Sequence, residues 1–425
     1  MPAQLVGTYA GLVARFHGDI VFVAGTILTS MVGFVGSVVA ARSLRPVEMG
    51  IMQTLLLIPA YCSFLHLGVF NGLSRDIALH QGKEDHGTVQ RIVNSSWWTA
   101  KIVAVFGLVI GGVFAGFYWI GGYPHLYLFG MIFVLVNLIA EPLSQHLEIV
   151  YLSSRKFRSL GVRLLWQNAV TFLGNLLPLR AGAAGFVAAR GVYSASRLAF
   201  RWTGVPIKAS APGKMKEVCD LAKIGMPLLV AGALYTFMGV ADRSVVACFM
   251  TPKDVGYFSL AGIVVAGIQF LPSCLATLLY PRVAACYGRT GSPRSLRRYF
   301  WILLVTNVAI LAPICLIGYF LVEPVTRHYL PKYIDGIPAA KLACLSSLTL
   351  AYFGVTCIIA VVRRNAWYIA AIAASLLLIW LLGGYLVHHG YGIVGAVWAR
   401  TVATGLLCIF TIAFAFRLTA ERGSN

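Results

Sequence analysis

Residues 19–41 read DIVFVAGTILTSMVGFVGSVVAA, an apolar run whose only charged residue is the first. A helix needs about 20 consecutive apolar residues to span the hydrocarbon core of a bilayer. The run is too long for the core of a signal peptide, and no small-residue cleavage site with a soluble domain follows it. We therefore expect it to be a transmembrane helix of the mature protein.

The rest of the chain has the same character. Hydrophobic residues make up 59% of the sequence and charged residues 11%, whereas a soluble protein is about 45–50% apolar and roughly 25% charged. The alternating pattern of a membrane β-barrel is missing from the sequence. These features predict an all-α integral membrane protein with about 12 transmembrane helices. After the first, the apolar stretches centre near residues 59, 108, 137, 169, 190, 236, 266, 310, 348, 377 and 404.

The distribution of basic residues predicts the orientation in the membrane. With the amino terminus in the cytoplasm, 23 Lys and Arg residues fall in predicted cytoplasmic segments and seven on the opposite face. Cytoplasmic loops carry such an excess in multi-pass proteins, so we expect an even number of spans with both termini cytoplasmic. The net charge of +20 then reflects topology and attraction to anionic membrane lipid. No nucleic-acid partner is expected.

The chain divides at residues 201–224, RWTGVPIKASAPGKMKEVCDLAKI, its most polar stretch. We predict a cytoplasmic linker there, between six-helix lobes at 1–200 and 225–425. A weak repeat relates the lobes: VAARSLRPVEMG, ending at Gly50, aligns with VACFMTPKDVG, ending at Gly256. Parallel repeats are typical of transporters with two lobes around a central site. We interpret the shared Pro-x-acid-x-Gly as the start of a helix, because proline and an acid both suit a first turn.

Polar and charged side chains recur at helical spacing inside the predicted spans. An ionisable group in hydrocarbon is costly, so it faces protein, a partner or a water-filled cavity. Residues three or four apart share one face of a helix, so these groups form stripes. The stripes are Asn137, Glu141, Gln145 and Glu148; Arg163, Gln167, Thr171 and Asn175; Arg190, Ser194, Arg197 and Arg201; Asp242 and Arg243; and Arg400, Thr401 and Thr404.

The three deepest arginines, Arg190, Arg243 and Arg400, have two interpretations. They either pair with Glu141 or Asp242 or bind an anion, and the sequence leaves both open. Their abundance predicts a hydrated, cationic cavity between the two lobes.

Four further polar residues have a structural alternative. Gln167 and Asn175 can hold the bundle together through hydrogen bonds between helices. Arg163 and Arg197 lie near the predicted cytoplasmic interface, where a long side chain can reach the lipid head groups.

Catalytic and metal-binding motifs are missing from the sequence. The nine cysteines lie singly, mostly inside apolar stretches, and none forms a close CxxC or Cys/His ligand set, which is typical of buried packing residues. DxD, GxSxG and HExxH motifs do not occur, and the longest predicted outer loop covers only about residues 322–335. We therefore expect no catalytic residues, no metal site and no cofactor, and we disfavour a membrane polymerase or ligase.

Residues 40–85, AARSLRPVEMGIMQTLLLIPAYCSFLHLGVFNGLSRDIALHQGKED, resemble the opening of the polysaccharide transporters. These are the O-antigen-type oligosaccharide flippases of the multidrug/oligosaccharidyl-lipid/polysaccharide exporter superfamily. The family pattern A-R-x-L-x-P-x-E-x-G is matched up to Gly50, and L-x-R-x-I-A is matched at residues 73–78. VADRSVVACFMTPKDVGYFSLA, at 240–261, is similar to a second family step. One departure is His66, where the family commonly has Asp.

The resemblance implies a V-shaped bundle that flips a lipid-linked oligosaccharide across the cytoplasmic (inner) membrane of a bacterium. It implies alternating access for a polyprenyl-diphosphate-linked repeat unit destined for surface polysaccharide or exopolysaccharide. Arginine binds phosphate oxygens through two parallel hydrogen bonds, and a sugar needs a hydrated path. The candidate residues are Arg190, Arg243 and Arg400 for the diphosphate, Arg163, Arg197, Gln167 and Asn175 for guidance and sugar contacts, and Glu141 and Asp242 for H⁺ or Na⁺ coupling or as counter-charges.

The expected partners are the lipid-linked oligosaccharide and membrane lipids, with a polysaccharide polymerase and chain-length proteins as further candidates. The alternative is an ion-coupled, multidrug-type exporter of small molecules from the same superfamily. A cavity that selects cations should be lined by carboxylates with few arginines, and the stripes here are richer in arginine. A peptidoglycan-precursor flippase is chemically close but often carries two more carboxy-terminal helices.

Overall fold

The computed structural model describes residues 2–362 and 365–420, which contain helices and no strands. Three basic residues used for the topology prediction, Arg363, Arg364 and Arg422, lie outside this range. The chain forms two compact units. Unit 1 comprises Met1–Leu44 and Leu55–Ala233, and unit 2 comprises Arg45–Thr54 and Leu234–Asn425.

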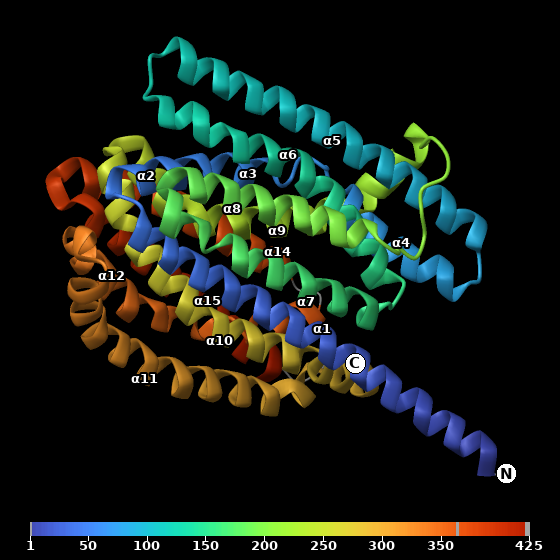
Figure 1. The fold of residues 1–425 in the computed structure, drawn as a ribbon. Helices are drawn as coiled ribbons and strands as arrows, with labels where there is room; N and C mark the ends of the chain where they lie inside the picture. Colours follow the sequence, from blue (N-terminus) through green and yellow to red (C-terminus); the bar gives the residue numbers. More distant parts are fainter. Residues whose placement is uncertain (1, 363–364, 421–425) are drawn as a thin grey trace. The chain divides into compact units, whose positions relative to one another are not determined.

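Unit 1 is a bundle of long helices in which α1 packs on α7, α5 on α6, and α6 on α8 (Figure 1). Its core contains fully buried Phe70, Leu73, Val93, Tyr151 and Leu160. Its helices are α1 (Pro2–Ser43), α3 (Leu57–Cys62), α4 (Val69–Gly82), α5 (His86–Ile120), α6 (His125–Ser153), α7 (Phe157–Gly174), α8 (Leu177–Trp202) and the first part of α9 (Met215–Phe249).

Unit 2 is also a helical bundle, in which α14 packs on α15 and α12 packs on both α10 and α11. One of its core clusters contains Val283, Leu303, Val355 and Ile358. Its elements are the rest of α9, α2 (Pro46–Leu55) except its last residue, α10 (Pro252–Thr290), η1 (Pro293–Leu296), α11 (Arg297–Tyr329), η2 (Pro331–Gly336), α12 (Ile337–Ser346), η3 (Ser347–Tyr352), α13 (Thr356–Val361), α14 (Asn365–Leu386), η4 (Val387–Tyr391) and α15 (Gly392–Ala420).

The two copies of Pro-x-acid-x-Gly both start helices, as predicted. Helix α2 begins at Pro46 and α10 at Pro252. Thr251 caps α10: its hydroxyl accepts a hydrogen bond from the Asp254 amide, and the Asp254 side chain accepts one from the Thr251 amide. The reciprocal bonds satisfy amide groups that have no partner inside the helix.

The repeated glycine has a packing role within unit 2. A side-chain carbon added to Gly50 would collide with the carbonyl oxygen of Pro252, and one added to Gly256 would collide with that of Pro46. Each copy of the motif therefore packs its glycine against the proline of the other. Only a residue without a side chain permits this backbone approach.

All twelve predicted span centres fall in helical segments, although several segments are broken. The predicted second span, centred near residue 59, falls on the short helix α3 directly after α2, and left-handed backbone at Leu67 and Gly68 separates α3 from α4. Length and composition identify seven helices able to cross a membrane among the described residues, or up to eight if α7 and α8, bent by 105°, count as one. The number twelve, the cytoplasmic termini and the lobe boundaries at 200 and 225 stay predictions.

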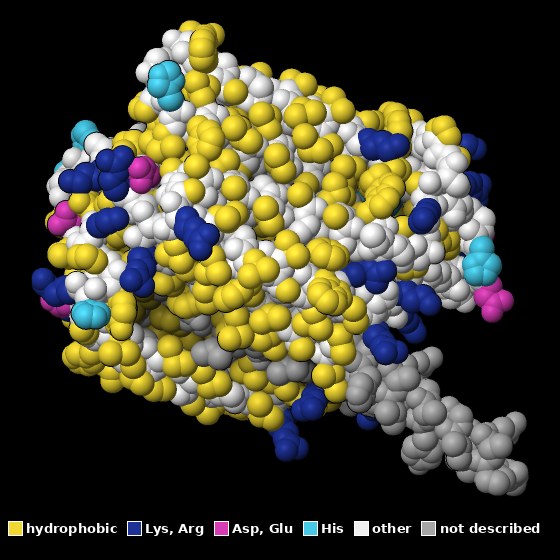
Figure 2. All heavy atoms as spheres, viewed as in Figure 1, with side chains coloured by type: hydrophobic (Ala, Val, Ile, Leu, Met, Phe, Trp, Pro, Cys, Tyr) yellow, Lys and Arg dark blue, Asp and Glu magenta, His cyan; other side chains and the backbone are white. Residues whose placement is uncertain are grey.

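The surface agrees with a membrane environment. In the face shown in Figure 2, hydrophobic side chains cover the helices, and Lys and Arg gather mainly near helix ends. Large apolar side chains on the long helices are exposed, such as Val109 at 58% and Leu381 at 72%. Exposed apolar surface of this extent suits contact with lipid rather than water.

Three predicted cytoplasmic segments of unit 1 contact one another. Gln81 donates to the Ser154 hydroxyl at 3.3 Å, which joins the ends of α4 and α6. Gln90 on α5 donates to the carbonyl oxygen of Lys208 at 2.8 Å, which fastens the 203–214 segment to the same end. The contacts bring these basic segments together, as the topology prediction requires for loops on one side of a membrane.

Candidate functional site

Unit 1 contains a cavity of about 250 Å³ between α3, α6 and α8. This is close to the lower end of the volumes of ligand sites. The cavity is lined by Leu56, Pro59, Ala60, Ser63, Phe133, Asn137, Glu141, Arg190, Tyr193 and Ser194.

Arg190 is the cation of this cavity. It lies on α8, and its guanidinium carbon is 5.1 Å from the centre of the Phe186 ring, one turn earlier. Within the described part of the chain, no carboxylate oxygen lies within 4.0 Å of an Arg190 nitrogen. Asn137 donates to the Ser194 hydroxyl at 3.1 Å in the same lining. The lining thus combines Arg190 with neutral hydrogen-bonding groups and with one carboxylate, Glu141, which is paired with Arg197. Arg190 suits an anionic ligand and the neutral groups suit a hydroxylated one.

A row of alternating charges joins α6 and α8. Arg197 is paired with Glu141, and its Nη2 is 3.4 Å from Oε2 of Glu148. Arg201 Nη2 is 3.0 Å from the same Glu148 oxygen. The arginine side chains are only 16% and 5% exposed, and buried charges of this kind need partners. Two arginines and two glutamates balance here, so Arg197 is not a free cation in this structure, whereas no carboxylate among the described residues pairs with Arg190.

Arg163 fastens the end of α8. Its Nε donates to the carbonyl oxygen of Thr203 at 2.6 Å, and its guanidinium lies over the Tyr151 ring at 5.2 Å. Its Nη1 also donates to Ser159, one turn earlier on α7. The bond to Thr203 holds the second turn of α7 against the residue that follows α8. Its predicted role in guiding the substrate stays a prediction.

Gln167 on α7 and Asn175, the residue after α7, lie outside the described cavity lining. Asn175 donates to the carbonyl oxygen of Val32 on α1 at 3.0 Å, which is the bundle-stabilising alternative. Gln167 is 1% exposed. Their assignment to the sugar stays a prediction.

In unit 2, Asp242 on α9 pairs with Arg400 on α15. The Asp242 Oδ2 to Arg400 Nη1 distance is 2.6 Å, and the side chains are 5% and 17% exposed. The other Asp242 oxygen accepts the Arg243 amide at 2.8 Å. The Arg243 guanidinium lies beside α10, since a Cβ atom added to Gly262 on α10 would be 3.6 Å from Nη2 of Arg243. Of the two alternatives for Arg400, pairing with Asp242 is therefore the one seen in this structure.

A family model described as "Polysaccharide biosynthesis protein" matches residues 17–286, well over half of the chain. The chain belongs to this polysaccharide biosynthesis protein family. The resemblance predicted from residues 40–85 and 240–261 is confirmed, since both stretches lie within the matched region. Comparison with curated proteins gives no significant match.

Solved structures show the same fold at low sequence identity. An inward-facing multidrug resistance MATE family transporter of the MOP superfamily is 12% identical, with a TM-score of 0.76 over 95% of this chain and 98% of that one. The lipid II flippase MurJ, in an inward closed conformation, is 13% identical, with a TM-score of 0.73 over 94% of this chain and 88% of that one. The prediction of an all-α, multi-pass membrane fold is confirmed.

The structure also adds residues that the sequence prediction did not assign to a site. Tyr193 and Ser63 line the Arg190 cavity in this family member. Asn168 donates to the carbonyl oxygen of Gly25 at 2.9 Å, and Asn175 makes the equivalent bond one heptad later on both helices. The seven-residue spacing of the two asparagines is a signal for a helix–helix seam that could have been used. The cavity lining had no such signal, because it depends on three helices at once.

Proposed function

We propose that this protein flips a polyprenyl-diphosphate-linked oligosaccharide repeat unit across the cytoplasmic (inner) membrane for surface polysaccharide or exopolysaccharide biosynthesis. The observation that carries this proposal is the family match over residues 17–286. The similarity in fold to a protein described as a lipid II flippase supports it. In this proposal the protein is a transporter rather than an enzyme, works by alternating access and needs no cofactor.

Arg190 is the residue that we propose to bind the diphosphate in unit 1. Its guanidinium has five N–H donors, and it lines a cavity in which no described carboxylate neutralises it. Asn137, Tyr193 and Ser194 in the same lining offer hydrogen bonds to sugar hydroxyls. Arg243 and Arg400 remain proposed diphosphate ligands, and Arg400 would first have to separate from Asp242.

Glu141 has a position that suits coupling. It lines the Arg190 cavity and is paired with Arg197, so an anion that draws Arg197 away would leave a carboxylate free to take up H⁺ or Na⁺. We propose Glu141 and Asp242 as coupling groups or counter-charges. A polysaccharide polymerase and chain-length proteins are the proposed protein partners, because they would use the translocated repeat unit.

The second candidate function is ion-coupled export of small molecules. Its specific support is the TM-score of 0.76 with a multidrug resistance MATE family transporter. The cavity lining contains both Arg190 and Glu141, but Glu141 is paired with Arg197. A site for cationic drugs would offer a carboxylate that no protein cation compensates, so this pairing disfavours drug export.

The leaflet distribution of lipid-linked oligosaccharide distinguishes the two functions. We expect cells without the protein to accumulate the intermediate on the cytoplasmic leaflet and to lose surface polysaccharide. Unchanged intermediates in such cells would contradict flipping and favour small-molecule export.

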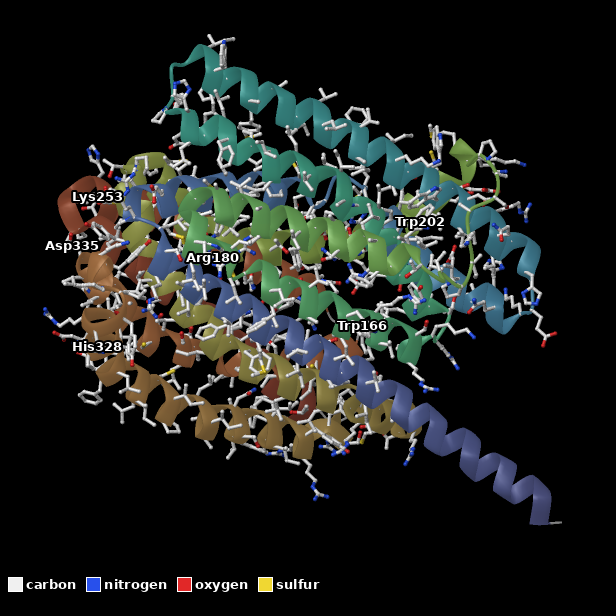
Figure 3. All side chains as sticks on the ribbon, viewed as in Figure 1. Trp166, Arg180, Trp202, Lys253, His328 and Asp335 are labelled. Carbon is white, nitrogen blue, oxygen red and sulfur yellow. The ribbon has the colours of Figure 1, made fainter. Side chains whose placement is uncertain are left out.

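Arg190→Gln tests the cavity. Hydrogen bonds to charged groups contribute about 1.5–3 kcal/mol each, so the change should lower flipping by about tenfold or more at equal protein level. Arg180→Gln is the matched control: Arg180 lies at the opposite end of α8 from Trp202, is exposed and is outside the described cavity lining (Figure 3). Normal export with Arg190→Gln would contradict the proposed phosphate contact.

A further inference from the structure

Unit 2 contains a second, larger pocket at the end that the charge distribution places outside the cytoplasm. Its volume is about 780 Å³, and it lies between the end of α11, η2 and the start of α12. This volume is within the range of ligand sites. The predicted outer loop at 322–335 is in fact the last turns of α11 followed by η2, so its charged residues stand on helices rather than on a flexible loop.

The charged residues of this pocket form one connected group. Glu323 on α11 accepts hydrogen bonds from Arg327, one turn later, at 3.0 Å, and from Nζ of Lys341 on α12 at 2.6 Å. Tyr319, one turn before Glu323, lies under the Lys341 ammonium at 5.3 Å. Two cations therefore share one carboxylate, which leaves this wall of the pocket with a net charge of +1.

Asp335 lines the same pocket. Tyr257 and Lys253, whose ammonium lies 5.4 Å from the centre of the Tyr257 ring, are close enough to Asp335 to interact with it electrostatically. Figure 3 shows Lys253, Asp335 and His328 at the same end of unit 2. The described lining holds two cations and two carboxylates, so it is the local excess of cations around Glu323, rather than the net charge of the pocket, that suits an anion.

Stability alone does not account for the Arg327–Glu323–Lys341 group. Arg327 is 58% exposed and Glu323 35% exposed, and exposed ion pairs contribute at most about 1 kcal/mol. Arg327 contacts Glu323 through the Nε and Nη2 edge of its guanidinium, so the other edge remains available to a second acceptor. The carboxylate thus orients both cations.

The flank of the pocket is apolar and exposed. Leu345 and Ile334, both in the lining, are 47% and 39% exposed. On α11, which supplies Tyr319, Glu323 and Arg327 to the lining, Ile317, Phe320 and Leu321 are 55%, 65% and 51% exposed. Because these residues belong to a helix long and apolar enough to span a membrane, hydrocarbon chains would cover them.

We propose that this pocket holds the phosphate group of a membrane lipid in the outer leaflet. Arg327 and Lys341 donate to the phosphate oxygens, and the lipid chain lies along the exposed apolar residues of α11 and α12. A pocket whose cations adjoin an apolar flank at the membrane surface suits a lipid phosphate better than a soluble anion. The cations then contact the phosphate, and the flank contacts the hydrocarbon chain. A phospholipid and a polyprenyl phosphate share this chemistry. The inference does not rest on flipping activity.

Native mass spectrometry of the full-length protein, released from detergent and titrated with phosphatidylglycerol, undecaprenyl phosphate or inorganic phosphate, tests the proposal. The test variant is Arg327→Gln with Lys341→Met. Arg45→Gln is the matched control, because Arg45 makes the same kind of exposed pair with Glu48, at 2.9 Å, outside the described pocket lining. Lys341→Arg keeps the positive charge, and thermal unfolding shows whether each variant is folded.

We expect the double variant to bind at least one of the two lipids about tenfold more weakly or worse, and Arg45→Gln and Lys341→Arg to bind as the unaltered protein does. Loss for phosphatidylglycerol alone identifies a phospholipid, and loss for undecaprenyl phosphate alone identifies a polyprenyl lipid. Equal lipid binding by a folded double variant, or an equal loss with Arg45→Gln, would overturn the site. If inorganic phosphate binds as tightly as both lipids do, the assignment of this pocket to a lipid is overturned.

Discussion

Replacing Asp242 by Asn should destabilise the protein more than replacing Asp242 and Arg400 together. The pair is nearly buried, with 5% and 17% of the side chains exposed and 2.6 Å between Oδ2 and Nη1. Removing one partner of a buried pair costs about 3–5 kcal/mol, because the other charge is left unpaired. Asparagine keeps the oxygen that accepts a hydrogen bond from the Arg243 amide, so Asp242→Asn removes the negative charge and leaves this bond in place.

The double variant, Asp242→Asn with Arg400→Met, removes the unpaired cation as well. Replacing both members of a buried pair is often close to neutral, so most of the lost stability should return. For a unit of roughly 200 residues, 1 kcal/mol corresponds to about 2–4 °C in Tm. A loss of about 3 kcal/mol should therefore lower the Tm of the single variant by about 6–12 °C.

The assay is thermal unfolding of the four proteins of the double-mutant cycle in nanodiscs, followed by tryptophan fluorescence. The coupling energy is the change in unfolding free energy of the double variant minus the sum of the changes of the two single variants. A double variant no more stable than Asp242→Asn would refute the reasoning, and so would a single variant with an unchanged Tm. Either result would mean that the charges are hydrated and do not depend on each other.

Gly50→Ala should sharply reduce the folded protein recovered from membranes, because its new carbon would collide with the Pro252 carbonyl oxygen; Gly112→Ala, with nothing within 4 Å of the added carbon, should not. Size-exclusion chromatography of detergent extracts measures both, and equal recovery would refute the packing argument. Arg197→Met should lower the Tm by several degrees because Glu141 loses its partner. Adding Glu141→Gln should restore part of that loss in the same unfolding assay, and no recovery would contradict the pairing.

Local features of the fold were predictable because they depend on neighbouring residues. Apolar length and the need to satisfy backbone hydrogen bonds inside lipid leave helices as the solution for this composition. The helix starts at Pro46 and Pro252 were also predictable, since a proline and an acid in the first turn act within a few residues. The packing of Gly50 and Gly256 was not, because it needs two helix starts about 200 residues apart in the chain.

The stripes predicted which residues share a helix face but not which faces meet. Glu141 and Glu148 stand seven residues apart on α6, and Arg197 and Arg201 four apart on α8, so both pairs were visible as stripes. Arg197 and Arg201 pair with the glutamates, whereas no described carboxylate pairs with Arg190; this difference depends on the register between α6 and α8. Register follows from side-chain shapes along the whole contact, which helical spacing does not describe.

By itself, the sequence determined that this protein is a helical membrane protein, that it resembles the polysaccharide transporters and that its buried charges need partners or water. Those conclusions follow from transfer free energies, which each residue carries wherever the chain places it. Only the tertiary structure decided that Arg400 pairs with Asp242 and that Arg190 faces a cavity. Pairing depends on distances of a few ångströms between helices remote in sequence, and the packing of the whole bundle sets those distances.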